Sequence, residues 1–408
     1  MQVRLEEFLH GTPDGEEASA ILGRCVHCGF CTATCPTYQL LGDELDGPRG
    51  RIYLVKQVLE GAAPTAKTQL HLDRCLGCRA CESTCPSGVE YGRLLDIGRR
   101  LVDGQVRRPA RERWLRGALK EGLSGPLFPT AMRMGQAMRG ILPAALKEQV
   151  PARRDPGAWP ARPHARKVLM LAGCVQPSMQ PNINAATARV FDALGVETIV
   201  PAGAGCCGAI RQHLDDAAGA LADARRNIDA WWPGLEAGAE AIVLNASGCG
   251  SQVKEYGHLL RQDAAYAAKA RRVSALARDL AECLPAEEAA LKQRITLASG
   301  SRVAFQAPCS LQHGQRIRGA VESLLAALGA DVVPVAEAQL CCGSAGTYSV
   351  LQPALSQALR ERKLEALTAA RPEVILSANI GCIVHLAAKS PVPVRHWIEW
   401  LDERLQEA

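Results

Sequence analysis

The sequence of 408 residues has no long apolar run and few aromatic side chains. No stretch approaches the roughly 18 consecutive apolar residues that a membrane-spanning helix needs. The first ten residues are acidic and lack an apolar run, so we expect no secretory signal. Aromatic residues make up 4% of the chain and the net charge is +5, which offers little for stacking on nucleic acid. We therefore expect a cytoplasmic protein without a nucleic-acid partner.

Several cofactor and hydrolase motifs are also missing. Gly203-Ala-Gly205 lacks the rest of a G-x-G-x-x-G fingerprint, and there is no P-loop and no nucleophile elbow. We predict no flavin or nicotinamide and no catalytic residue on this chain. Cysteine, in contrast, is abundant, with 17 residues. In a reducing compartment so many cysteines indicate metal or redox chemistry rather than disulfides.

Two cysteine runs of identical spacing stand near the N-terminus. Each has the form C-x-x-C-x-x-C-x-x-x-C-P, from Cys25 to Pro36 and from Cys75 to Pro86. Three thiolates at two-residue gaps converge on one soft metal centre, and the fourth, before proline, ligates the other cluster in two-cluster proteins. The spacing predicts two [4Fe-4S] clusters, one held by Cys25, Cys28, Cys31 and Cys85 and the other by Cys75, Cys78, Cys81 and Cys35.

Zinc is the alternative metal for these runs. Structural zinc sites draw on separated cysteine pairs, and two complete four-cysteine runs fit that pattern poorly. Between the runs, Gly50 to Glu60 has helical spacing. We therefore expect residues 1–98 to form a mostly helical, ferredoxin-type domain with two clusters.

Residues 99–166 form a basic connector punctuated by prolines. Eight cationic side chains lie between Arg99 and Lys120, against only Asp103 and Glu112. Four prolines between Pro151 and Pro163 follow, as is typical of a linker. The segment is either a solvated connector or a docking surface for an acidic partner or anionic lipid headgroups.

The rest of the chain alternates buried strands with helices, which predicts an α/β fold with parallel sheets. We expect two lobes, residues 167–295 and 296–408, because the order of strands, helices and cysteines recurs. Cys174 and Cys309 are 135 residues apart, and so are Cys206 and Cys341. A repeat of this length is stronger evidence of fold than local propensity.

Each lobe has four cysteines at expected strand ends. Ligands gather at the carboxyl ends of parallel strands, so each set is expected to converge. The sets could bind a further cluster, react as thiols or be buried structural cysteines, and the sequence leaves all three open. Cys283 has no counterpart and is expected to be an ordinary thiol. The sets are Cys174, Cys206, Cys207 and Cys249, and Cys309, Cys341, Cys342 and Cys382.

Two ferredoxin-type runs followed by two Cys-Cys-Gly lobes resemble the iron–sulfur subunits of flavin-linked hydroxyacid dehydrogenases, in particular those of bacterial glycolate oxidase (glycolate dehydrogenase). The stretches from Pro36 to Tyr53 and from His71 to Gly92 carry the likeness, which extends over the whole chain. The resemblance implies flavoprotein partners that hold FAD and oxidise glycolate to glyoxylate. It also implies electron transfer through this chain to a membrane acceptor such as quinone. Such a subunit is inactive alone and is peripheral on the inner face of the cytoplasmic membrane.

Two other functions remain open. One is the iron–sulfur subunit of an L-lactate or glycerol-3-phosphate dehydrogenase, and the other is a thiol or disulfide reductase acting through the Cys-Cys-Gly lobes. The related heterodisulfide reductase subunits have C-x-x-C around the last cysteine of each lobe. Here Cys249 is followed by Gly-Ser-Gln and Cys382 by Ile-Val-His, which departs from that pattern.

Overall fold

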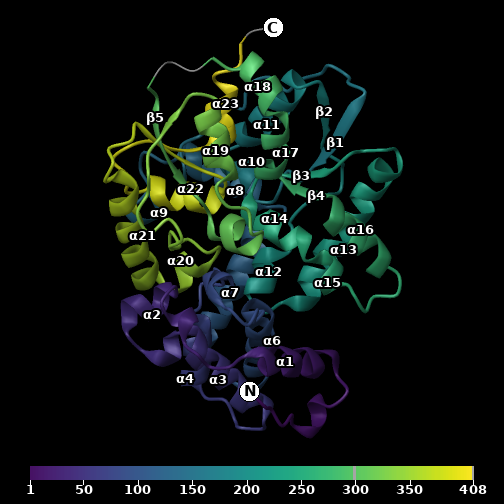
Figure 1. The fold of residues 1–408 in the computed structure, drawn as a ribbon, viewed down its shortest axis with the longest axis vertical. Helices are drawn as coiled ribbons and strands as arrows, with labels where there is room; N and C mark the ends of the chain where they lie inside the picture. The colour runs from purple at the N-terminus through teal and green to yellow at the C-terminus, as the bar shows by residue number, and fades with distance from the viewer. Residues whose placement is uncertain (297–299, 407–408) are drawn as a thin grey trace.

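The structure is a computed structural model that describes residues 1–296 and 300–406. Two parallel sheets lie in the upper part of the molecule (Figure 1). The strand order is β2-β1-β3-β4 in one sheet and β6-β5-β7-β8 in the other, and all pairs are parallel. Counted within each lobe, the two orders are the same, so the repeated α/β fold is confirmed. The strands are β1 Arg166–Met170, β2 Val196–Ile199, β3 Ile242–Leu244, β4 Ala277–Asp279, β5 Arg302–Gln306, β6 Asp331–Val332, β7 Val374–Ser377 and β8 Val394–His396.

The sequence pattern missed the fourth strand of each sheet, because β4 and β8 have three residues each and lie beside helices. The other strands and the main helices lie where the pattern placed them. Residues 297–299 and 407–408 of the expected second lobe lie outside the described residues. The lobe helices are α10 Gln176–Met179, α11 Asn182–Ala193, α12 Ala209–His213, α13 Ala217–Glu236, α14 Ser247–Lys254, α15 Tyr256–Leu259, α16 Ala267–Leu276, α17 Leu280–Cys283, α18 Glu288–Arg294, α19 Ala320–Ala327, α20 Tyr348–Leu351, α21 Pro353–Thr368, α22 Ile380–Ala387 and α23 Trp397–Asp402.

The two lobes share one hydrophobic core. Val168 and Val190 of the first lobe and Val303 and Trp397 of the second belong to the same cluster of buried side chains. A polar contact also joins the two lobes: the His396 imidazole lies 2.8 Å from the Asn245 carbonyl oxygen. The lobes therefore hold their cysteine sets in a fixed relation.

The N-terminal domain is helical and lies beneath both lobes (Figure 1). Proline stands at the start of α1, α2 and α3, where its fixed φ and missing N–H favour a helix beginning. Helix α3 confirms the helix expected between the cysteine runs. The helices are α1 Pro13–Arg24, α2 Pro36–Leu41, α3 Pro48–Leu59, α4 Ala66–Asp73, α5 Ala80–Thr84 and α6 Tyr91–Gln105.

The basic connector is mostly helical, with α7 Ala110–Ser124, α8 Phe128–Ala137 and α9 Ala144–Lys147. Some of the basic side chains of the connector are buried. Arg99 is buried and donates to the carbonyl oxygens of Leu72 and Cys75, and buried Arg108 pairs with Asp73. The segment is therefore not wholly solvated. Among the described residues, no helix has the length and apolar character needed to cross a bilayer.

Candidate metal centres

The two N-terminal cysteine loops have the same backbone shape. Each starts where a helix ends, since Cys25 directly follows α1 and Cys75 follows the last turn of α4. Left-handed conformations, which favour glycine, recur at matching places in the two loops. These turns curl each loop so that its first three cysteines surround one point. The left-handed residues are His27 and Gly29 in the first loop and Gly77 and Arg79 in the second.

The fourth cysteine of each loop lies with the other loop. The thiol of Cys31 is electrostatically coupled to Cys25, Cys28 and Cys85, and these four border one small cavity, which Cys81 also touches. The thiol of Cys81 is coupled in the same way to Cys78, Cys75 and Cys35. We call these sets group 1 (Cys25, Cys28, Cys31 and Cys85) and group 2 (Cys75, Cys78, Cys81 and Cys35). The crossed grouping is the one that the spacing predicted, and ligation by these residues stays a prediction.

The thiols of both groups suit a bound cationic centre. Burial raises the pKa of Cys31 to about 11, and burial with the nearby Cys78 and Cys75 raises the pKa of Cys81 well above its usual value. Four neighbouring thiols, some of them buried, cannot all ionise without a compensating positive charge. A metal centre supplies that charge and binds sulfur as thiolate.

The spacing of the sulfur atoms favours a cluster over a single ion. Zn–S bonds of about 2.3 Å place tetrahedral thiolates roughly 3.8 Å apart. Among the described residues, no three cysteine sulfurs lie within 4.8 Å of one another; Asp43, Asp46 and His71 are the one such set of potential ligands. A [4Fe-4S] centre does not need so compact a set, because each thiolate binds a different iron.

The surroundings of the two groups differ. Group 1 lies at the surface, where Cys28 is exposed between Val26 and Phe30, 70% and 62% exposed. Group 2 is enclosed. The Tyr91 hydroxyl donates to Cys75 Sγ at 3.5 Å, and the buried Arg51 guanidinium lies 4.0 Å from Cys35 Sγ. Donors and positive charge near the sulfurs favour the reduced state of a cluster.

Group 2 also contacts the second lobe, which the sequence did not predict. The thiols of Cys78 and Cys309 are close enough that Cys78 raises the pKa of Cys309, and Leu76 packs in one cluster with Cys341 and Tyr348. The Tyr348 hydroxyl donates to the Arg74 carbonyl oxygen at 3.1 Å. No pattern in the sequence connects a loop at residue 78 with a lobe that begins some two hundred residues later.

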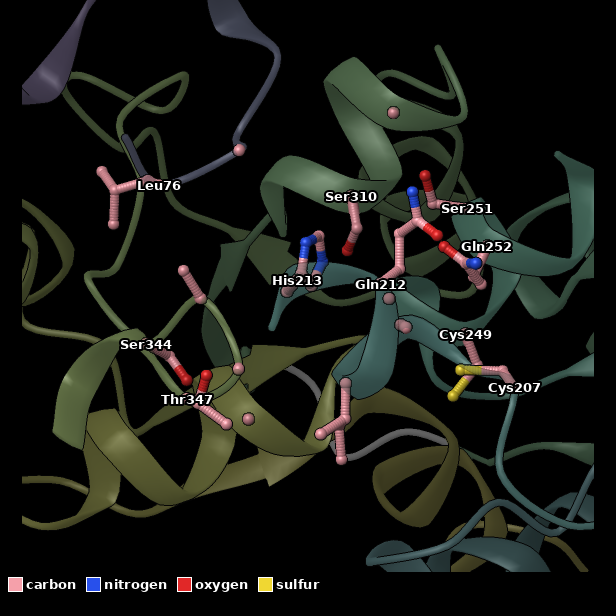
Figure 2. A pocket seen from close by; sticks show the side chains of 18 of the residues that line it. Leu76, Cys207, Gln212, His213, Cys249, Ser251, Gln252, Ser310, Ser344 and Thr347 are labelled. Carbon is pink, nitrogen blue, oxygen red and sulfur yellow. The ribbon is translucent and has the colours of Figure 1, made fainter. Parts of the chain in front are cut away.

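Each lobe brings its four cysteines together in a chain of contacts. In the first lobe, the Cys206 thiol interacts with those of Cys174 and Cys207, and the Cys207 thiol interacts with that of Cys249; Figure 2 shows the last two side chains adjacent. Hydrogen bonds from Cys174 and Cys207 lower the pKa of Cys206 to about 3.

The second lobe repeats this chain of contacts, from Cys309 to Cys341 and on to Cys342, whose sulfur lies 3.1 Å from that of Cys382. The expected convergence of the lobe cysteines is therefore present. Their chemistry is that of soft-metal ligands or of redox thiols.

One cavity of about 840 Å³ connects these features. Both lobe sets and Cys78 line it, together with the inner faces of α7 and α8 through Leu119 and Met132. Gln212 and His213 of α12 point into it from the first lobe (Figure 2). The volume suits a small organic ligand, and such a ligand would lie beside group 2.

Comparison with known proteins agrees with this arrangement. The model of a 4Fe-4S dicluster domain matches residues 21–89, and that of a cysteine-rich domain matches residues 168–254 and 303–387. The glycolate oxidase iron-sulfur subunit of Escherichia coli (strain K12) is 52% identical over the full length of both chains. The chain belongs to the family of glycolate oxidase iron–sulfur subunits. It is thus an iron–sulfur electron-transfer protein of an oxidoreductase.

Other relatives differ in how much of this subunit they cover. The probable glycolate oxidase iron-sulfur subunit of Bacillus subtilis (strain 168) is 31% identical over 93% of this chain and 90% of its own. Lactate utilization protein A of Geobacillus thermodenitrificans (strain NG80-2) is 25% identical over 58% of this chain and 99% of its own. The full-length likeness is therefore to glycolate oxidase iron–sulfur subunits.

The glycine of each Cys-Cys-Gly is required by the fold. Gly343 has φ +89°, and a Cβ there would lie 2.4 Å from the Ser356 carbonyl oxygen. We expect Gly343→Ala to destabilise the protein by about 2–4 kcal/mol, from backbone strain and the clash together. The measurement is the free energy of unfolding in urea, followed by circular dichroism.

Gly346→Ala is the matched control for that substitution. Gly346 has φ +63° but an added Cβ would meet nothing within 4 Å, so only the strain of about 1 kcal/mol remains. Equal losses in the free energy of unfolding for the two variants would show that the clash with the Ser356 carbonyl oxygen does not contribute.

Proposed function

We propose that this chain is the electron-transfer subunit of a flavin-dependent complex that oxidises glycolate to glyoxylate. Full-length identity of 52% to a glycolate oxidase iron-sulfur subunit carries the proposal. The crossed grouping of the eight N-terminal cysteines supports two cofactor sites. Flavoprotein subunits of the complex hold FAD, and this chain is inactive without them.

In this proposal, group 1 and group 2 each bind one [4Fe-4S] cluster through their four cysteines. Such clusters accept and donate single electrons, which divides the two-electron oxidation of a hydroxyacid into one-electron steps. Electrons pass first to group 1 and then to group 2 in this proposal. Exposed Cys28 lets the flavoprotein approach group 1, whereas group 2 faces the lobes and the cavity through Cys78.

Electrons leave from group 2 toward the cavity in this proposal. A membrane quinone is the acceptor, because the cavity beside Cys78 is lined mostly by apolar side chains such as Leu119, Leu123 and Phe128 and suits a lipophilic molecule. The protein acts as a peripheral subunit on the inner face of the cytoplasmic membrane.

Co-purification from native cells tests this function. A tagged chain is expected to bring down flavin-containing subunits, and the eluate is expected to reduce a soluble dye with glycolate faster than with L-lactate. Iron analysis is expected to give about eight iron atoms per chain if groups 1 and 2 alone are filled, and more if a lobe set also binds a cluster.

Three results would contradict the proposal: purification of the chain alone, stoichiometric zinc in place of iron, or glycolate oxidation that persists after deletion of the gene. A higher rate with L-lactate would instead favour the lactate-oxidising alternative, which the 25% identity of part of the chain to lactate utilization protein A supports.

A further inference from the structure

The outer side of helices α7 to α9 carries exposed apolar residues. Trp114, Leu127 and Ile141 are 73%, 78% and 77% exposed, and Met134 is 60% exposed. On α7, Trp114 shares its face with Arg111 and Ala118, three residues before it and four after it, because side chains at these spacings align on a helix. We call this outer side the connector face.

The connector segment also carries exposed cations that have no ion-pair partner. Six exposed basic residues form no ion pair with any described residue; they are Arg107, Arg111, Arg113, Arg133, Lys147 and Arg153. Exposed Arg133 donates only to the Pro129 carbonyl oxygen. The connector face is therefore both apolar and strongly positive.

Most acidic residues of the segment pair inward and do not offset this charge; the exception is exposed Asp155, which among the described residues accepts only from the Gly157 N–H. Glu112 binds Arg108 and Arg116, and Glu148 binds Arg360 and Lys389. Glu121 pairs with Arg211 of the first lobe. These ion pairs hold the helices to the lobes and leave the outward cations free for a partner.

The opposite side of the same helices borders the cavity. Leu119 and Leu123 of α7 and Phe128 and Met132 of α8 line it, and Gln136 fastens α8 to the first lobe by donating to the Ser178 carbonyl oxygen at 3.2 Å. One helical layer thus separates the connector face from a cavity that reaches Cys78.

We propose that the connector face binds the surface of an anionic phospholipid bilayer. Tryptophan and aliphatic side chains enter the interfacial region of the lipid, while arginine and lysine contact the headgroup phosphates. The inference rests on the proposed function, in which a lipophilic acceptor reaches the cavity, and it names the surface that brings the cavity to the membrane.

The distribution of charge favours lipid over a protein partner. The core of a protein–protein interface is depleted of charge and gathers its apolar residues together. On α7, Arg111 shares a face with Trp114, and exposed Arg113 directly precedes Trp114 in the chain. A fluid anionic surface can satisfy cations at irregular spacing, whereas a folded partner needs a carboxylate at each place.

Vesicle sedimentation of the full-length chain with its clusters tests the proposal. We expect binding to vesicles that contain phosphatidylglycerol and no binding to pure phosphatidylcholine, and we expect added salt to weaken it. Arg111→Gln/Arg113→Gln is expected to lower the partition coefficient about twentyfold, because each basic residue near the surface contributes about fivefold. Trp114→Ala is expected to weaken binding further.

Matched controls distinguish the effect of charge on the connector face from the effect of the protein's net charge. Arg271 and Arg294 are exposed and form no ion pair with any described residue, so Arg271→Gln/Arg294→Gln removes the same charge elsewhere and is expected to bind vesicles like the wild type. Phe8→Ala, at a side chain 59% exposed, serves the same purpose for Trp114→Ala.

Absence of vesicle binding, equal binding to phosphatidylcholine, or equal losses in test and control variants would overturn the proposal. If the Arg111/Arg113 variant keeps vesicle binding but loses the flavoproteins, the face belongs to an acidic protein partner. Dye-linked glycolate oxidation by the complex in solution is expected to stay unchanged in all these variants. Absence of glycolate oxidation by the wild-type complex would contradict the proposed function, not the binding of the connector face to lipid.

Discussion

Cys35→Ser is expected to remove the cluster proposed for Cys75, Cys78 and Cys81 and to leave the cluster proposed for its own loop intact. The thiol of Cys35 is electrostatically coupled to Cys78, and burial raises its pKa, so it lies with group 2. Loss of one thiolate from a buried [4Fe-4S] site removes the ligand of one iron. The measurement is iron content with EPR of the reduced protein, in which about four irons and one of two signals are lost.

The reciprocal variant Cys85→Ser distinguishes crossed from uncrossed ligation. Cys85 is coupled to Cys31, so its replacement is expected to remove the group 1 signal and to keep the one that Cys35→Ser removes. Cys283→Ser is the control, because this thiol lies apart from both groups and is expected to leave iron content unchanged. If each variant instead loses the signal of its own loop, the crossed assignment is wrong.

The repeat of the lobes could be predicted because its evidence is a short sequence pattern that occurs twice in the chain. Cys174 and Cys309, which follow β1 and β5, are 135 residues apart, and β1 and β5 hold the same central place in their sheets. The crossed cysteine groups could be predicted for a similar reason, since a fixed spacing limits which thiols one short loop can direct to a single point. Short strands such as β4 lack such a signal, because tertiary pairing rather than propensity forms them.

Contacts between distant segments could not be predicted. The approach of Cys78 to Cys309 depends on how the helical domain docks on a lobe, through contacts between distant residues such as Ser83 and His313, whose side chains lie 3.0 Å apart. The connector shows the same limit. Its basic composition was evident, but only the structure separates buried Arg99 and Arg108 from the exposed arginines of the connector face.

Arg51→Met is expected to cause the largest loss of stability among single substitutions near group 2. The Arg51 side chain is 1% exposed and pairs with Asp46, which is fully buried. Its guanidinium also donates to the His71 carbonyl oxygen at 2.7 Å and to Thr37 Oγ1 at 3.1 Å. Breaking a buried ion pair from one side costs about 3–5 kcal/mol, measured as the free energy of unfolding in urea.

The same substitution is expected to make group 2 harder to reduce. Arg51 is a fixed positive charge 4.0 Å from Cys35 Sγ, and removing it disfavours the extra electron of the reduced state. The midpoint potential, followed by EPR during a redox titration, is expected to become more negative. Each tenfold fall in the ratio of reduced to oxidised protein corresponds to about 59 mV for one electron.

Arg49→Met is the matched control, two residues away on α3. Arg49 forms an ion pair with Glu44 in which both side chains are more than a third exposed, 37% and 40%, and exposed pairs contribute about 0–1 kcal/mol. We expect little change in stability and no change in the group 2 potential. Arg51→Lys keeps the charge but not the three-way hydrogen bonding, so it is expected to restore the potential more fully than the stability. A potential in Arg51→Met equal to that of the wild type would leave Arg51 as a structural residue only, because the loss of stability alone does not require an effect on the cluster.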